Sequence, residues 1–124
     1  MSRLRFGIAV PVAASLLATL GLSAALAAKD ASEVDALVES IRAIDGDPAY
    51  GEYLGGECVT CHRRSGPTEG IPRISGISDA HFVRAMVEYR EKIRTNEVMR
   101  TTAQRLSDEE IAALAAHFAE REPQ

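Results

Sequence analysis

The residues best suited to chemistry lie together at Cys58-Val59-Thr60-Cys61-His62. Two thiols three positions apart can form thioether bonds to the two vinyl groups on one side of a porphyrin, and the histidine that follows can then bind the iron as the proximal ligand. The chain has 2 cysteines in all, and a bridge between neighbours this close would add little stability. The spacing therefore predicts one covalent haem c, attached at Cys58 and Cys61, with His62 on the iron.

Two other kinds of site use Cys-x-x-Cys. A thioredoxin-like redox pair sits in a βαβ setting, and no strand pattern is visible here. A structural zinc site needs four ligands, whereas His81 and His117 are far from His62 in sequence and from each other. Haem attachment accounts for the motif better than either alternative.

The first residues predict export. Arg3 and Arg5 precede an apolar run that ends in the small-x-small sequence Ala25-Leu26-Ala27. This three-part pattern predicts a Sec-type signal peptide over 1–27, cleaved to leave a mature chain in the periplasm. The alternative is an uncleaved anchor, because the run is long enough to span a bilayer. Gly, Pro, Ser and Thr residues interrupt the run, so we expect no stable membrane span after cleavage.

The charge balance narrows the class of partner. The chain carries 14 basic and 18 acidic residues, for a formal charge of −4. Removing Arg3 and Arg5 with the signal peptide takes the net charge to about −6. An acidic chain with no block of Lys and Arg lacks the electrostatic footprint of nucleic-acid binding. A partner protein with a basic face is the better match.

The mature chain reads as all-α. An amphipathic helix is expected within 28–46, and Asp47 with Pro48 starts a second helix. That helix should run to Gly55 or Glu57 and lead the chain into Cys58. Gly51 marks a close crossing of this helix with the last one. The segment 47–124 forms the main domain.

Two more helices follow a loop over 63–77. Ser78 with Asp79 caps a third helix with one continuous apolar stripe formed by Phe82, Met86, Tyr89 and Ile93. The segment 95–106 has no clear period. Ser107 and Glu110 form a capping box that begins the last helix, whose buried face is expected to contain Ile111, Leu114, Ala115 and Phe118.

The chain resembles the class I monohaem c-type cytochromes. The resemblance runs from Asp47 to Ala119 and rests on four segments: 51–54, 70–76, 94–99 and 106–116. Within that family it looks most like the small cytochrome domains of flavocytochrome c sulfide dehydrogenases. The implied fold is a small helical bundle wrapped around covalently bound haem, with the 63–77 and 95–106 loops covering the two haem faces.

The sixth ligand has four candidates: Met86, Met99, His81 and His117. Met86 lies on an apolar stripe, where methionine usually fills core space. Met99 lies in irregular sequence, where a loop can bring sulfur to the iron, and the resemblance also puts the ligand there. His/Met ligation raises the reduction potential of a haem. His81 and His117 are interpreted as an exposed or capping residue and a packing residue.

Pro72 enters through the resemblance, which implies that its carbonyl accepts a hydrogen bond from the other ring nitrogen of His62. Such a bond fixes the orientation of the ligand and tunes the metal. The alternative is an ordinary turn proline, and the sequence alone does not separate the two.

The function expected is electron transfer rather than catalysis, because no nucleophile set or nucleotide fingerprint is present. The chain would be a soluble carrier or the cytochrome subunit of a redox enzyme, by resemblance one that oxidises sulfur compounds. Expected partners are redox proteins: a flavoprotein or molybdoenzyme donor and a downstream cytochrome or oxidase. The alternative is a gas-binding haem protein, which needs an open sixth site.

Overall fold

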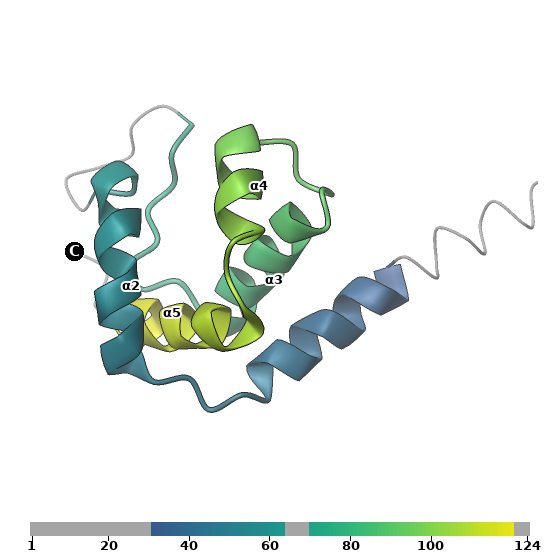
Figure 1. Ribbon diagram of the computed structural model, residues 1–124, viewed down its shortest axis with the longest axis horizontal. Coiled ribbons are helices and arrows are strands. Elements are labelled where there is room, and N and C mark those ends of the chain that lie inside the picture. The colour runs from purple at the N-terminus through teal and green to yellow at the C-terminus, as the bar shows by residue number, and fades with distance from the viewer. Residues whose placement is uncertain (1–30, 64–69, 121–124) are drawn as a thin grey trace, which may run out of the picture. The chain divides into compact units, whose positions relative to one another are not determined.

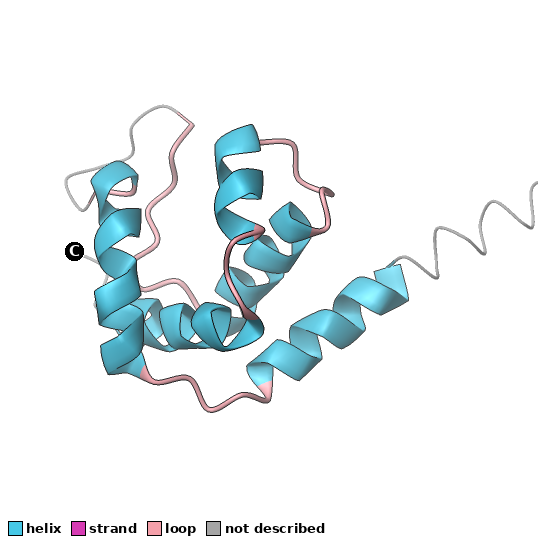
Figure 2. Ribbon diagram, in the orientation of Figure 1, coloured by secondary structure: helices cyan, strands magenta, loops and turns pink. Residues whose placement is uncertain are grey.

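The computed structural model describes residues 31–63 and 70–120, and the compact unit that contains nearly all of them runs from Glu33 to the C-terminus. The predicted signal peptide lies outside the described residues. The described part of the chain forms helices and no strand, as the all-α prediction requires (Figure 2). The helices are an N-terminal helix over 31–42, α2 (Pro48–Cys61), α3 (Asp79–Arg90), α4 (Glu97–Ala103) and α5 (Asp108–Glu120) (Figure 1).

Helix α5 is the centre of the unit. Its start is the predicted capping box: the Ser107 backbone N–H donates to Glu110 Oε2 at 2.8 Å, and the Glu110 N–H donates to Ser107 Oγ at 3.2 Å. Helices α2 and α3 pack on α5, and α4 packs on α3. The core around α5 consists of fully buried side chains, among them Ile111, Leu114, Phe118, Val83 and Val87.

Helix α2 crosses α5 so closely at Gly51 that the crossing leaves no space for a side chain there. A Cβ atom built on Gly51 would overlap the backbone carbonyl of Ala113 and lie 2.8 Å from the Cβ of His117. A Cβ on Gly55 would lie 3.2 Å from the Phe118 ring. Glycine is therefore required at position 51, and the expected crossing of these two helices is confirmed.

The start of α2 follows the prediction, but its end does not. Asp47 Oδ1 accepts from the Ala49 N–H at 2.8 Å, and Pro48 occupies the first turn. The predicted end at Gly55 or Glu57 is wrong, because α2 continues to Cys61. Packing against α5 compensates for the low helix propensity of glycine. The helix ends only at His62, whose φ of −86° and ψ of 64° are not helical.

Helix α3 begins as predicted, with Ser78 Oγ accepting from the His81 N–H at 3.3 Å. The predicted apolar stripe is wrong at its end: Ile93 lies beyond the helix and is 57% exposed. The chain turns at Lys92, a non-glycine residue at φ 62°. The Ile93 and Arg94 N–H groups then donate back to the Glu88 carbonyl at 2.8 and 3.1 Å.

The segment around Met99 is also more regular than expected. It forms the short helix α4 rather than a loop, because Asn96 provides an N-cap: its Oδ1 accepts from the Met99 N–H at 3.1 Å. An Asn followed by Glu is a helix-start signal. The length of the helix, 7 residues, is too short to show a hydrophobic period.

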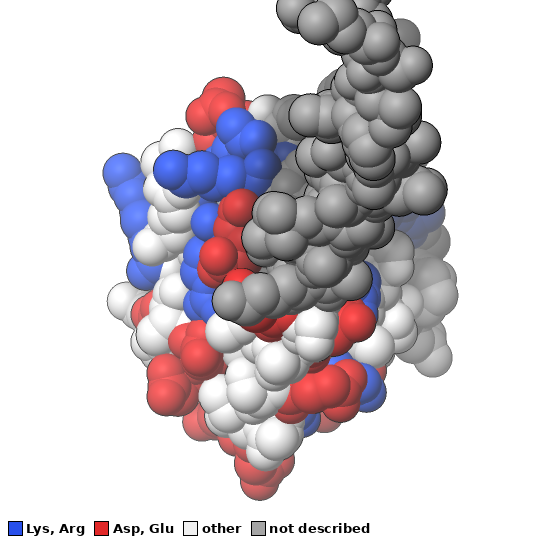
Figure 3. Space-filling model, turned by 90° about the vertical axis from the view of Figure 1, so that its right-hand side faces the viewer, with Lys and Arg blue, Asp and Glu red and all other residues white. Residues whose placement is uncertain are grey.

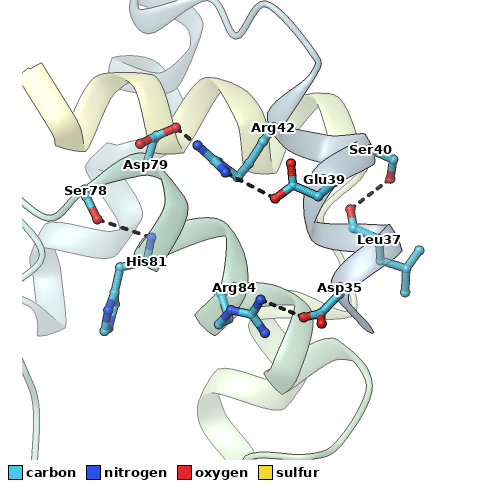
Figure 4. Close-up of polar contacts among 9 residues, drawn as sticks. All are labelled: Asp35, Leu37, Glu39, Ser40, Arg42, Ser78, Asp79, His81 and Arg84. Atoms are coloured by element: carbon cyan, nitrogen blue, oxygen red, sulfur yellow. Dashed lines mark hydrogen bonds and ion pairs between the residues drawn. The ribbon is translucent and has the colours of Figure 1, made fainter. Parts of the chain in front are cut away.

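The N-terminal helix packs on the same core. Its apolar stripe of Val34, Val38 and Ile41 is buried with the core of α3 and α5. Two ion pairs join it to α3: Arg84 to Asp35 at 2.7 Å and Arg42 to Asp79 at 3.5 Å (Figure 4). Among the described residues, no helix has the length and apolar character needed to cross a membrane.

Candidate functional site

The two cysteines lie on the last turn of α2, three residues apart and so about 60° apart around the helix. The two are not joined in a disulfide. Cys58 is half-buried and packs against the core, whereas Cys61 is exposed. Burial raises the pKa of the Cys58 thiol, so this thiol stays protonated around neutral pH. The helix therefore presents two thiols to a common region from one turn.

His62 follows directly as the residue that ends α2, and its N–H donates to the Cys58 carbonyl at 2.9 Å. Its Nδ1 lies 2.7 Å from the Pro72 carbonyl oxygen. A carbonyl can only accept, so this contact places a hydrogen on Nδ1 and leaves the lone pair on Nε2. The ring is thus fixed in the tautomer that binds a metal through Nε2.

The segment 70–77 that supplies the Pro72 carbonyl is itself anchored. The Gly76 N–H donates to the Phe118 carbonyl at the C-terminal end of α5, at 2.9 Å. Ile74 and Ile77 pack against the core. Gly70 and Gly76 have positive φ values of 80° and 74°, which glycine adopts without strain. The proline carbonyl is therefore held in place by tertiary contacts of the residues that follow it.

The four candidate sixth ligands have different surroundings. Met86 is only 4% exposed and lies in the core of α3, where it fills space. His81 is exposed, and His117 is buried with its ring edge against Phe118, 5.0 Å between centroids. Met99 is half-buried at the edge of the core, on α4. Of the four, Met99 combines a ligand atom with a position that is neither fully buried nor fully exposed.

The Cys58–His62 motif lies at the end of α2, whereas Met99 lies on a different helix, α4. In Figure 1, α2 and α4 both rise from α5, and the segment 70–77 descends between them. Helices α2 and α4 are not in contact with each other; each is held by a different neighbour, α5 for α2 and α3 for α4. The relation between His62 and Met99 therefore depends on the frame formed by α3 and α5.

These residues suit a haem c. A pair of thiols one turn apart precedes an imidazole whose Nε2 is available. The apolar side chains that are half-buried against the core include Leu54, Val59, Ile74 and Met99. The described residues contain no group of three or more His, Cys, Asp or Glu side chains placed to hold a metal ion among themselves. An imidazole nitrogen and a thioether sulfur are donor types that bind the iron of a porphyrin in cytochromes c.

Charged residues around α4 are paired with one another. Arg94 Nε lies 2.6 Å from Glu88 Oε2, and the Arg94 guanidinium sits 5.4 Å from the centroid of the Tyr89 ring. The Glu88 carboxylate raises the pKa of Arg94 above its ordinary value. On the face shown in Figure 3, Lys and Arg side chains gather toward the top and Asp and Glu are more numerous below.

Three residues near Met99 were not found from the sequence: Arg94, Asn96 and Arg100. The side chains of the two arginines bridge the α3–α4 turn, and Asn96 caps the backbone of Met99. The Asn96-Glu97 pair was a readable helix-start signal. The arginines carry no such signal: Arg94 pairs with the Glu88 side chain across a turn, and Arg100 donates to backbone carbonyls that no motif encodes.

Comparison with known proteins places this site in context. The chain is 36% identical over 84 residues to cytochrome c-554(548) of Halomonas halodenitrificans, a match that covers 62% of this chain and 99% of that protein. It is 32% identical over 77 residues to cytochrome c4 of Thiocapsa roseopersicina, covering 60% of this chain and 40% of the relative. A thiosulfate dehydrogenase electron acceptor of Stutzerimonas stutzeri is 36% identical over 62 residues, 48% of this chain and 29% of that protein. No family model matches the chain.

Proposed function

Because the chain belongs to the class I c-type cytochromes, we propose that it transfers single electrons in the periplasm through one haem c bound at Cys58 and Cys61. The relatives are cytochromes c and an electron acceptor, which supports a haem c and a role in electron transfer rather than catalysis. His62 is the residue that follows the cysteine pair. The observation that best supports the proposed site is the 2.7 Å contact between its Nδ1 and the Pro72 carbonyl oxygen.

His62 and Met99 have different roles in the proposed site. His62 binds iron through Nε2, and its Nδ1–H bond to Pro72 fixes the ring and makes the ligand a stronger donor. Met99 would supply its thioether sulfur as the other protein ligand of the iron. When bound, the haem supplies a one-electron iron couple whose potential His/Met ligation raises. The half-buried apolar residues Leu54, Val59 and Ile74 exclude water and so favour the less charged, reduced state.

The count of one haem and its covalent attachment rest on the cysteines. The chain has 2, both in the last turn of α2, so two thioether bonds would use every thiol. Intact mass of the purified protein should exceed that of the polypeptide by one haem, and the haem should resist extraction by acidified solvent. Cys61→Ala should lose one thioether bond and shift the reduced absorption maximum to longer wavelength.

The periplasmic location rests on the signal-peptide pattern in residues 1–27. The mass of the mature N-terminus measures this directly. A chain beginning near Ala28 supports the proposal, and a retained Met1 contradicts it in favour of an anchor.

The names of two relatives support a proposal about the redox partners. Two relatives are thiosulfate dehydrogenase electron acceptors, so we propose that this chain accepts electrons from an enzyme that oxidises a sulfur compound. A flavoprotein or a molybdoenzyme fits as donor, and a downstream cytochrome or oxidase fits as acceptor. A flavocytochrome-type sulfide dehydrogenase is one form that such a donor complex takes.

The sixth ligand is tested by substitution. Met99→Ala should abolish the far-red sulfur–iron charge-transfer band of the oxidised protein and lower the reduction potential. Met86→Leu is the matched control, because Met86 is buried in the core and leucine conserves its volume. That variant should keep the band. Retention of the band in Met99→Ala contradicts the assignment, and rapid stoichiometric carbon monoxide binding by the reduced wild type would favour a gas-binding protein.

A further inference from the structure

We propose that Arg100 is a positioning residue that holds Met99 on the haem iron by locking α4 to the turn that precedes it. The inference rests on the proposed ligation by Met99. Arg100 is the next residue along α4, and its guanidinium extends back over the α3–α4 turn. It acts on the ligand through the backbone and does not itself touch the metal.

Helix α4 needs such a support because it is short. It has 7 residues, Glu97–Ala103, whereas an isolated helix below about 12 residues is marginal in water. Only Ala103 within it is fully buried, and Val98 is 69% exposed. Apolar burial therefore contributes little to holding α4 in place, and polar contacts must account for more of it.

Arg100 makes those contacts with all three of its nitrogen atoms. Its Nε donates to the Arg94 carbonyl at 2.6 Å and its Nη2 to the Lys92 carbonyl at 2.9 Å. Its Nη1 pairs with Glu97 Oε1 at 2.6 Å, in the first turn of α4. The side chain is 22% exposed. One planar group thus joins two carbonyls of the turn to the start of the helix.

The far side of the turn is tied to α3, so the connection is continuous. Arg94 is paired with Glu88 on α3 at 2.6 Å and lies over the Tyr89 ring. Lys92, one of the two residues whose carbonyl accepts from Arg100, has the left-handed φ of 62° that non-glycine residues seldom adopt. A turn with this backbone geometry persists only where surrounding contacts hold it. Arg100 supplies two of those contacts.

The position of Met99 within α4 completes the argument. Its backbone N–H is capped by Asn96 Oδ1, and the adjacent Arg100 N–H donates to the Asn96 carbonyl at 3.0 Å. Met99 therefore lies between the cap and the guanidinium contacts. If those contacts are lost, α4 can move away from α3 and the thioether can leave the iron without unfolding of α2 and α5.

Competition by an added ligand measures this effect. In the oxidised full-length holoprotein, imidazole replaces the methionine and bleaches the far-red sulfur–iron band. Arg100→Ala should lower the apparent dissociation constant for imidazole about tenfold, equivalent to about 1.4 kcal/mol. Arg100→Lys keeps the charge but not the planar fork, so it should give an intermediate value. Arg105→Ala is the matched control, because Arg105 is exposed just beyond α4 and its value should stay within about twofold of wild type.

The outcomes separate the two proposals. If the wild type has no far-red band, or Met99→Ala keeps it, the proposed ligation fails. If Met99→Ala loses the band and Arg100→Ala binds imidazole like wild type, the ligation stands and the inference about Arg100 is overturned. An equal effect of Arg105→Ala also overturns it, because loss of positive charge would then suffice. Far-UV circular dichroism spectra of the Arg100→Ala and Arg100→Lys variants, compared with that of the wild type, show whether the rest of the fold is intact.

Discussion

Helices α2 and α4 carry the two sides of the candidate site, and they are held in place by different physics. Helix α2 is fixed to α5 through glycines, with the backbone at Gly51 in direct contact with the Ala113 carbonyl. Helix α4 is tied to the preceding turn through side-chain hydrogen bonds, mainly those of Arg100, and that turn is tied to α3 by the Arg94–Glu88 ion pair. Both helices begin with an N-cap, Asp47 and Asn96.

The difference predicts different mechanical behaviour. Backbone contact at van der Waals distance is steep, so α2 cannot shift without separating from the core. Hydrogen bonds at a half-exposed turn can exchange with water at a net cost of about 1 kcal/mol each. We therefore expect the histidine side of the site to be lost only on global unfolding and the methionine side to be released more easily.

The largest effect is expected at the α2–α5 crossing. Gly51→Ala places a methyl group into the Ala113 carbonyl, and the helices must separate to admit it. We expect the free energy of unfolding to fall by about 3 kcal/mol. Denaturant unfolding of the holoprotein, followed by far-UV circular dichroism, measures it.

Gly56→Ala is the control on the same helix. A Cβ at Gly56 meets nothing within 4 Å, so this change should stabilise the protein by about 0.5–1 kcal/mol through helix propensity. Equal effects of the two substitutions would show that the close crossing does not hold α2.

The two N-caps give the next largest effect and compare the helices directly. Asp47→Ala and Asn96→Ala should each cost about 1 kcal/mol of local helix stability. Loss of Asp47 should lower the midpoint of global unfolding and leave the far-red band unchanged. Loss of Asn96 leaves the Met99 N–H without its cap. In Asn96→Ala the far-red band should therefore disappear at a lower denaturant concentration than the helical circular dichroism signal does. Coincident transitions in Asn96→Ala would mean that α4 does not open separately.

The smallest expected effect is on the pH dependence of the free energy of unfolding, through Tyr50 on α2. The Tyr50 hydroxyl donates to Glu110 Oε1 at 3.2 Å. Desolvation, followed by this bond to the carboxylate, raises the pKa of Tyr50 above 10.0. A raised pKa in the folded state means that the stabilisation is present below the unfolded pKa and is lost as pH rises through the folded one.

Tyr50→Phe should therefore flatten the decline in stability between about pH 9 and 11. Unfolding midpoints of wild type and variant across this range measure the difference. Parallel declines in the two proteins would show that the Tyr50–Glu110 bond does not contribute.

Much of the helical frame could be predicted because its signals are local. The Ser107–Glu110 capping box, the Asp47-Pro48 start and the Ser78 cap each depend on residues within one turn, and each forms as expected. The ends of helices were less predictable. The last turn of α2, the end of α3 before Ile93 and the helical state of Met99 depend on packing and on a turn with an unusual backbone angle.

The sequence by itself determined the chemistry: the cysteine pair, His62 and an available thioether are covalent features that no fold can add or remove. Only the tertiary structure decided how they are supported. The contact between His62 and Pro72 spans ten residues, Gly51 meets an α5 carbonyl, and Arg100 reaches the carbonyls of a turn. Backbone carbonyls are the same at every position, so their choice of partner is fixed by where the folded chain places them.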